Sequence, residues 1–287
     1  MRVVAERAYH TSDPRALMQR LRADTAYSFA SRDRVIPAID SILARAWAAV
    51  PQWFALQPRA KVHVQPYPEF QEPAVPLGEY LNAALDGSRP GIYRINLYLA
   101  TKPGARLSLD NLTFHEAVPG HHFQISIAME RQRAHPLTRY LDNSGFVEGW
   151  GIYAETLAGE MGLYGSDATW LKELEDHLYT VATLVMETGM HTKGWSRQQA
   201  IDYELAHTTR SAEQGAIDVD RRIGLPGQGF SYIVGYLEIA RLRKEAERAL
   251  SSRFDIRTFH DRVLEDGGIT LGMLREKIER WLATAAQ

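Results

Sequence analysis

Three histidines and a glutamate gather in one short stretch, at His115, Glu116, His121 and His122. A familiar zinc-binding signature is His-Glu-x-x-His on a helix, where two histidines four residues apart share a face and the glutamate is the general base. Here the second histidine comes two residues late, because a Pro-Gly pair stands at 119–120. Removing that pair would restore the signature.

The spacing of these histidines decides what the Pro-Gly pair must do. On a straight helix, residues 115 and 121 point about 240° apart, while 115 and 122 share a face but are separated by about 10 Å of rise. Neither pair can hold one zinc ion. Pro119 lacks an N–H and clashes with the carbonyl of His115, and Gly120 tolerates unusual backbone angles. We therefore predict a bulge that carries His121, rather than His122, to the second-ligand position. The simpler interpretation is a proline-kinked helix with surface histidines.

A catalytic zinc site needs a third protein ligand and leaves a fourth position for water. Glu148 and Glu155 are the candidates, seven residues apart on one face of an apolar stretch that spans 145–155. Only one can reach the metal. We predict Glu148 as the ligand, because adjacent glycines let another helix approach closely, and Glu155 as a hydrogen-bond partner of a ligating histidine. The alternative for either is an ordinary solvated carboxylate.

Composition limits the other classes of function. The chain has 287 residues, 45% hydrophobic content, a net charge of −2 and no cysteine. It can bury a substantial core, nothing indicates nucleic-acid binding, and histidine and carboxylate are the strong metal ligands available. No stretch has the length of a signal-peptide core or of a membrane span, so a cytoplasmic setting is expected.

Periodicity predicts a mainly α fold with a small β-sheet (α+β), as a single catalytic domain over 1–287. N-terminal helices occupy 1–60 and the metal-binding core occupies 61–287. Apolar spacing and capping residues predict the elements. Expected helices are 13–25, 31–49, 144–160, 167–188, 197–214, 229–250, 256–265 and 271–284, with strands at 60–66 and 92–99. A long ordered loop is expected over 66–91, and a turn at His135-Pro136. The active-site helix is expected from Ser108 or Asp110 to about residue 132, broken at Pro119.

Further motifs accompany this core and carry a resemblance. They are His115 to Gln124, Glu148-Gly149-Trp150-Gly151 with Tyr153-Ala154-Glu155, Ser88 to Asn96, Thr188 to Ser196, and Pro226 to Gly235. Together they resemble the family called domain of unknown function 885 (DUF885), which is similar to gluzincin metallopeptidases. The match spans nearly the whole chain and resembles the C-terminal catalytic half of family members.

The chain departs from the family pattern at several places. The helical N-terminal half is missing, Glu187 stands where an aspartate is expected, and Arg222 stands where an aromatic residue is expected. An arginine expected shortly before Leu184 is also missing. These departures concern the substrate side of the cleft more than the metal side.

The remaining site residues are assigned with explicit alternatives. Gln124 and His122 are candidates for contacts around the metal ligands. The resemblance raises His191, otherwise a loop histidine, to a candidate catalytic residue, and Tyr232, otherwise a core tyrosine, is a candidate oxyanion donor. Three arginines could bind a substrate carboxylate or simply pair with local acids. They are Arg221, Arg241 and Arg243.

The function predicted from these residues is metal-assisted hydrolysis, with Zn²⁺ on His115, His121 and Glu148 and with Glu116 as general base. The resemblance implies short peptides as substrates, and it suggests that the strand at 92–99 pairs with them. One alternative is a non-catalytic peptide-binding or structural module, and another is a zinc amidase acting on a non-peptide substrate. An open cleft would favour a homo-oligomer or a separately encoded N-terminal partner.

Overall fold

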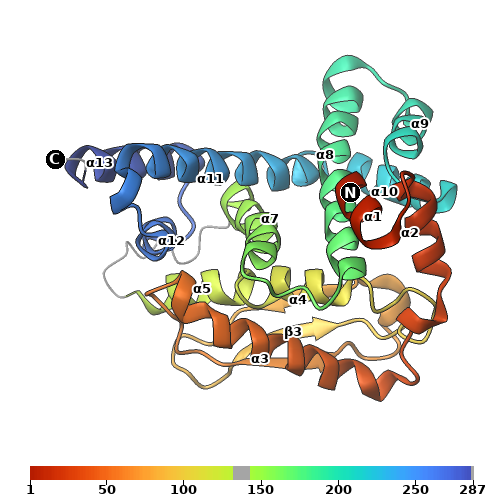
Figure 1. Ribbon diagram of the computed structural model, residues 1–287, viewed down its shortest axis with the longest axis horizontal. Helices are drawn as coiled ribbons and strands as arrows, with labels where there is room; N and C mark the ends of the chain where they lie inside the picture. The colour runs from red at the N-terminus through yellow and green to blue at the C-terminus, as the bar shows by residue number, and fades with distance from the viewer. Residues whose placement is uncertain (132–142, 286–287) are drawn as a thin grey trace.

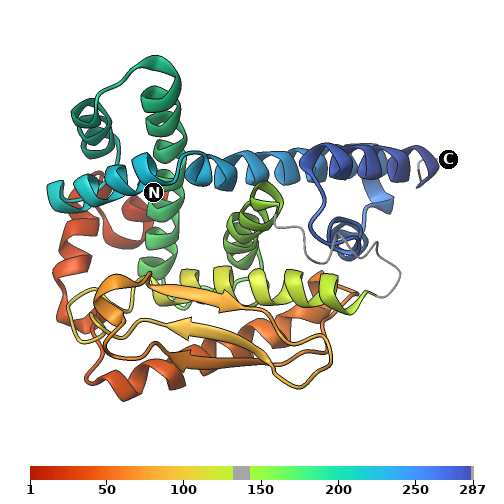
Figure 2. The ribbon, with the colours of Figure 1, turned by 180° about the vertical axis from the view of Figure 1, so that it is seen from behind.

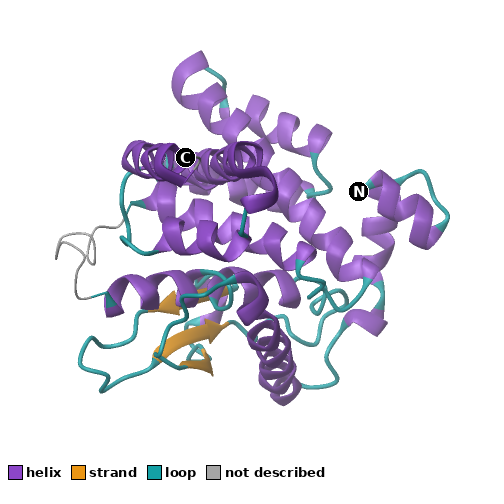
Figure 3. Cartoon of the chain, turned by 60° about the vertical axis from the view of Figure 1, so that its left-hand side comes forward, coloured by secondary structure: helices purple, strands orange, loops and turns teal. Residues whose placement is uncertain are grey.

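The computed structural model describes residues 1–131 and 143–285, and it is mainly helical with one small sheet (Figures 1 and 3). The α-helices are α1 (Arg2–Tyr9), α2 (Pro14–Ala23), α3 (Val35–Trp53), α4 (Leu109–Glu116), α5 (His121–Glu130), α7 (Ser144–Glu160), α8 (Asp167–Lys193), α9 (Arg197–His207), α10 (Ala212–Gly224), α11 (Gln228–Leu250), α12 (Ile256–Leu264) and α13 (Leu271–Ala285). The strands are β1 (Val62–Pro66), β2 (Gly78–Leu81) and β3 (Gly91–Ile95). The predicted fold class is confirmed.

The sheet is mixed, with strand order β1-β3-β2. β1 runs parallel to β3, and β2 runs antiparallel to it with Tyr80 opposite Tyr93. Figures 1 and 2 show α4 and α5 lying in a row between this sheet and the helices α7 and α11. The sheet thus supports the histidine-bearing helices from one side, while α7 and α11 cover them from the other.

The helices that carry the predicted metal ligands, α4, α5 and α7, share one apolar core. Phe54, Phe114, Phe123 and Trp150 are fully buried in it, and they come from α4, α5, α7 and the end of α3. Helices α1 and α2 instead pack with the start of α8, and α9 and α10 pack with its C-terminal part. The metal motifs therefore stand on the largest core, whereas α9 and α10 stand on a small one.

Several predicted elements need correction. The expected loop at 66–91 contains β2, and the strand expected at 92–99 begins at Gly91 and ends at Ile95. Helix α1 was not expected. The helix expected over 197–214 ends at His207, and a separate α10 follows. Capping explains that division, because Ser211 accepts the N–H of Gln214 and so starts a new helix.

Other predicted elements agree closely with the structure. The helix expected at 13–25 is α2, whose N-cap Asp13 accepts the N–H groups of Arg15 and Ala16. Its first residue is Pro14, a position where the missing N–H costs nothing. The turn expected at His135-Pro136 lies outside the described residues. Among the described residues, no helix combines the length and apolar character needed to cross a membrane.

Candidate metal centre

The interruption predicted at Pro-Gly is present and separates α4 from α5. The N–H of Phe123 bonds to the carbonyl of Ala117 at 3.2 Å, six residues back rather than the usual four. Gly120 passes so close to the previous turn that a Cβ there would lie 1.9 Å from the carbonyl oxygen of His115. Only glycine fits this crossing, so the Pro-Gly pair is a structural requirement of the bulge.

Helix α7 packs against the bulge through two residues of its Glu-Gly-Trp-Gly motif. The indole Nε1 of Trp150 donates to the carbonyl of Pro119 at 2.9 Å, in a fully buried position. A Cβ on Gly151 would lie 2.5 Å from Cε1 of His115, so this glycine makes room for the imidazole ring. The motif therefore anchors the break between α4 and α5 and makes room for the His115 ring.

The crossing of α7 with α11 is equally close. A Cβ on Gly235 would lie 1.8 Å from the carbonyl oxygen of Gly145 and 2.7 Å from the Cα of Gly149. Backbones that approach this closely leave no room for any side chain. The contact brings Tyr232, one turn earlier on α11, over the ring of His115, with ring centroids 6.2 Å apart.

His115, His121 and Glu148 converge as the sequence predicts. Each offers one ligand atom, and the three atoms lie within 4.8 Å of one another. Oε2 of Glu148 is 3.5 Å from Nε2 of both histidines. Two ligands bound at about 2.0–2.1 Å to a tetrahedral zinc are about 3.3–3.4 Å apart. Oε2 of Glu148 is also buried without a hydrogen-bond partner. The donor set and its spacing fit a zinc ion.

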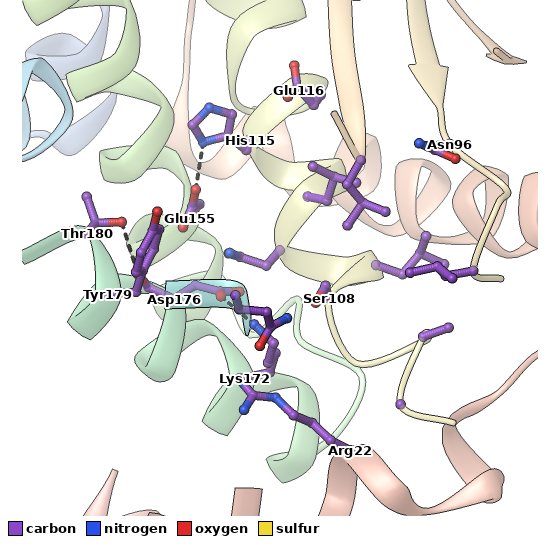
Figure 4. A pocket seen from close by; sticks show the side chains of 18 of the residues that line it. Arg22, Asn96, Ser108, His115, Glu116, Glu155, Lys172, Asp176, Tyr179 and Thr180 are labelled. Atoms are coloured by element: carbon purple, nitrogen blue, oxygen red, sulfur yellow. Dashed lines mark hydrogen bonds and ion pairs between the residues drawn. The ribbon is translucent and has the colours of Figure 1, made fainter. Parts of the chain in front are cut away.

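Glu155 supports the cluster from behind. Its Oε1 accepts a hydrogen bond from Nδ1 of His115 at 2.6 Å (Figure 4), and Nε2 of the same ring lies 3.5 Å from Oε2 of Glu148. A carboxylate behind a ligating histidine fixes its tautomer and orientation. His121 has no equivalent support, because its Nδ1 is buried without a partner. Both polar atoms of the buried Gln124 amide are likewise unpartnered, so within the described residues it makes no hydrogen bond to a metal-ligating side chain.

Neighbouring charges shift the pKa values of both His115 and Glu148 when no metal is bound. Burial alone would lower the pKa of His115, but the carboxylates of Glu148 and Glu155 outweigh it and hold that pKa well above its ordinary value. Burial would raise the pKa of Glu148, but the two histidines hold it well below its usual range. The site is therefore electrostatically prepared for a cation among these groups.

His122 lies on the opposite side of α5, against the sheet. Its Nε2 donates to the carbonyl of Ala60 at 3.2 Å, and its Nδ1 accepts from the hydroxyl of Tyr80 at 3.1 Å. Burial lowers its pKa to about 4. The structure thus brings His121, and not His122, to the metal cluster. The contacts of His122 hold α5 to β2 and to the segment before β1.

A cavity of about 580 Å³ opens beside the cluster. His115, Glu116, Glu155 and Tyr232 line it, together with residues of α8 and α10. Figure 4 shows His115 joined to Glu155, with Lys172, Asp176 and Arg22 further along the wall. Within the described residues, no hydrogen bond or ion pair engages the carboxylate of Glu116, a buried residue that lines the cavity.

Tyr232 also lines the cavity and is partly buried. Burial and the nearby charge of Glu148 raise the pKa of its hydroxyl well above the usual value, against the opposing charges of Arg222 and Arg221. A tyrosine that keeps its proton remains a hydrogen-bond donor at neutral pH. Its position over His115 is consistent with the predicted oxyanion contact.

Three predicted residues lie elsewhere. His191 is exposed at the end of α8 and donates from Nε2 to the carbonyl of Arg222 at 3.2 Å, so it is not a cavity residue. Arg241 is paired with two glutamates of its own helix. Arg243 is held by Glu160 on α7 and Glu247 on α11. Both arginines therefore pair with local acids, as in the alternative given above, whereas Arg221 lines the cavity.

Sequence reasoning missed the polar wall of the cavity. Lys172, Tyr179, Arg210 and Arg222 all line it, and of these only Arg222 stood out in the sequence, as a departure from a family pattern. The predicted pairing of substrate with the strand at 92–99 also needs correction. β3 already has a strand on each side, so the free sheet edge nearest α4 belongs to β2.

Comparison with known proteins agrees with this architecture. A family model described as bacterial protein of unknown function (DUF885) matches residues 1–278. No curated protein matches the chain. A solved structure described as a "putative lipoprotein" from Colwellia psychrerythraea is 31% identical with a TM-score of 0.92, over 99% of this chain and 49% of that chain. A second, described as a "putative lipoprotein of unknown function" from Shewanella oneidensis, is 20% identical with a TM-score of 0.80, over 96% and 52%. The chain thus spans about half the length of the solved structures it matches.

Proposed function

The chain belongs to the DUF885 family of bacterial proteins, and for this member we propose a zinc-dependent hydrolase that cleaves amide bonds of short peptides. One observation carries the proposal. Two imidazole nitrogens and one carboxylate oxygen converge within 4.8 Å beside a cavity that also holds the carboxylate of Glu116. Two histidines, a glutamate and a neighbouring acid are the components of a metallohydrolase centre.

Each residue then has a distinct part. A zinc ion held by His115, His121 and Glu148 would supply Lewis acidity to an attacking water and to the substrate carbonyl. Glu116 follows the first ligand directly and has no fixed partner, so its carboxylate can accept a proton from the water and deliver it to the departing amine nitrogen. Tyr232 keeps its proton and can donate to the carbonyl oxygen as negative charge develops there. Glu155 holds the His115 ring in the orientation that the cluster requires.

Metal content and a glutamate variant test the proposal together. We expect the purified protein to carry close to one zinc per chain and to digest a mixed peptide library. Glu116→Gln should retain the metal and lose hydrolysis by roughly 10²–10⁴-fold. An exposed control, Glu279→Gln on α13, should leave both unchanged. A protein that binds no transition metal after reconstitution would favour the non-catalytic module. A metal-loaded protein that leaves every peptide intact would favour the amidase alternative.

Exposed apolar side chains motivate a proposal about partners. Leu178 and Val181 project from α8 and Ile217 projects from α10, all on helices that also wall the cavity. We propose that a second copy or a separately encoded partner covers them, because exposed apolar surface of this kind favours association. Light scattering that finds a monomer with full peptidase activity would refute this. The cytoplasmic setting also stays a prediction, which fractionation of the source cells would test.

A further inference from the structure

The arginines of the C-terminal half differ in how many of their N–H donors are engaged. A guanidinium has five. Arg243 uses its donors in short bonds, to Glu247 at 2.9 Å and to both oxygens of Glu160 at 2.9 and 2.7 Å. Arg241 likewise bonds both oxygens of Glu238, at 2.9 and 2.7 Å. Neither lines the cavity, and acidic side chains engage most of the donors of each.

Arg222 is different, although its side chain is only 8% exposed. It lines the cavity, and its two terminal nitrogens make only long bonds, 3.3 Å to Oε1 of Gln228 and 3.4 Å to the hydroxyl of Tyr179. Its Nε is buried without a hydrogen-bond partner. The nearest carboxylate is Glu187, with Oε1 at 4.0 Å. A buried guanidinium with unused donors is costly unless something else engages it.

Glu187 cannot fully satisfy that guanidinium because its own oxygens are engaged. They accept the backbone N–H groups of Gly227, Gly229 and Phe230 at 3.0–3.2 Å, which fixes the start of α11. On the other side, His191 holds the main-chain carbonyl of Arg222 at 3.2 Å. The backbone on both sides of the arginine is therefore anchored, while its charged head faces the cavity.

Arg221 adds a second guanidinium at the same place. Its terminal nitrogen approaches the same Oε1 of Gln228, at 3.5 Å, and the residue also lines the cavity. Over 1–131 and 143–285, no carboxylate lies within 4.0 Å of it, whereas Arg210, also on the wall, lies 3.4 Å from Asp218. Two adjacent arginines that share one neutral amide as partner offer a strong site for a carboxylate.

The position of this pair relative to the metal cluster indicates which carboxylate it would hold. Gln228 lies one helical turn before Tyr232 on α11, about 6 Å along the axis, and Tyr232 stacks over His115. One residue of extended peptide spans about 3.3–3.6 Å. A carboxylate at the arginines would then lie one or two residues beyond a carbonyl placed at Tyr232.

We infer that Arg221 and Arg222 form a fork that binds the C-terminal carboxylate of a peptide, so that the substrates are peptides with a free C-terminus, cleaved one or two residues from that end. This inference rests on the proposed function and assigns the substrate class. Arg222, which breaks the family's sequence pattern, becomes the residue that selects the substrate end.

Equilibrium binding tests the fork without relying on turnover. The full chain is titrated calorimetrically with an N-acetylated dipeptide carrying a free carboxylate, with its C-terminal amide, and with an amide whose last side chain is acidic. The free acid should bind roughly 10–100-fold more tightly than its amide, because charge-assisted hydrogen bonds to a carboxylate are lost in the amide. The inference would be overturned if the free acid and its amide bound equally well. It would also be overturned if the amide with an acidic last side chain bound as tightly as the free acid.

Variants locate the effect and separate it from the proposed hydrolysis. Arg221→Gln and Arg222→Gln should each remove most of the preference for the acid, and Arg221→Lys should restore part of it. Arg241→Gln, an arginine outside the cavity, should preserve it. Arg221 is exposed, so its variants answer the question even if Arg222→Gln fails to fold. Preference for the acid without any zinc-dependent cleavage would sustain the fork and refute the hydrolase. Equal cleavage of acid and amide would sustain the hydrolase and refute the fork.

Discussion

The region that carries the metal ligands, called the floor, and the helices α8, α9 and α10, called the wall, are built in opposite ways, and both contribute residues to the cavity. The floor consists of α4, α5 and α7 with Tyr232 of α11, and its close backbone contacts are made by glycines while Glu155 holds its ligating His115. The wall consists of α8, α9 and α10. It buries carboxylates that accept no hydrogen bond, at Glu173 and Glu204. The floor is thus held in one geometry by specific contacts, whereas the wall buries acidic side chains that lack hydrogen-bond partners.

The same contrast appears in how the two regions treat small residues. On the floor, an added Cβ at Gly120 or Gly235 would overlap a backbone oxygen at 1.9 or 1.8 Å. On the wall, an added Cβ at Gly215 of α10 would meet its nearest atom, a leucine methyl, at an ordinary 3.4 Å. The glycines around the ligands therefore meet rigid backbone, whereas Gly215 on α10 has room for a methyl group.

The largest expected effect tests whether the floor holds the metal. His115→Ala and His121→Ala should each reduce the zinc content from about one per chain to near zero, because two ligands rarely retain zinc. His122→Ala is the matched control on the same helix and should keep the metal, since that ring bonds to Ala60 and Tyr80. Elemental analysis of the three purified variants decides. Loss of zinc in His122→Ala alone would mean that the bulge presents the other histidine.

The next prediction compares one glycine from each region. Gly235→Ala should destabilise the protein by about 3 kcal/mol or more, because the new methyl group overlaps the backbone of α7 and neither helix can yield locally. Gly215→Ala should be neutral or stabilise by up to about 1 kcal/mol, since alanine favours the helix and nothing obstructs it. Chemical denaturation measures both. Similar stabilities for the two variants would remove the distinction between a rigid floor and a tolerant wall.

A smaller effect distinguishes the two glutamates of α7. Glu148→Gln removes a metal ligand and should abolish tight zinc binding. Glu155→Gln removes only the acceptor of the His115 Nδ1 hydrogen bond, so the zinc affinity should fall by about 10–100-fold. Competition with a chromophoric chelator measures both affinities. The reverse order would exchange the roles of the two residues.

The sequence predicted the floor better than the wall for a physical reason. The histidine spacing could be reconciled with zinc only by a bulge at Pro119-Gly120. Glu148 and Glu155, two helical turns apart on α7, were the candidates for the third ligand. Such local patterns are readable because they lie within a few turns of one helix. The wall depends on contacts between residues distant in sequence, such as Arg222 with Tyr179, and periodicity contains no information about them.

Individual errors follow the same rule. His191 had a site-like neighbourhood in sequence, but its ring bonds to the carbonyl of Arg222, a residue 31 positions away on α10. β2 was hidden in a segment rich in proline and glycine, because its four residues become a strand only by pairing with β3. Arg241 pairs with acids three and four residues away on α11, which helical spacing alone could have indicated, whereas the contact of Arg243 with Glu160 on α7 is not visible in any local pattern.

The last prediction concerns Glu173, the wall residue whose buried carboxyl contrasts most directly with Glu155. Both are nearly inaccessible, but Glu155 bonds to His115 while neither oxygen of Glu173 has a partner. Burial, and then the charge of Glu155, raise the pKa of Glu173 to about 9. In the unfolded chain a glutamate titrates near pH 4.3.

The sign of the effect follows from proton linkage. Below about pH 4, Glu173 is protonated in both the folded and the unfolded protein, and its contribution to stability is complete. Between about pH 4 and pH 9, Glu173 loses its proton only in the unfolded protein, so the free energy of unfolding falls as pH rises. Glu173→Gln cannot ionise, so it should equal the parent in stability near pH 4 and gain on it by at most about 1.4 kcal/mol for each pH unit above that. Thermal denaturation across this range, with Glu279→Gln as the exposed control, measures the difference. A constant difference at every pH would mean that Glu173 is ionised in the folded protein and that the wall compensates its buried charge as fully as the floor does.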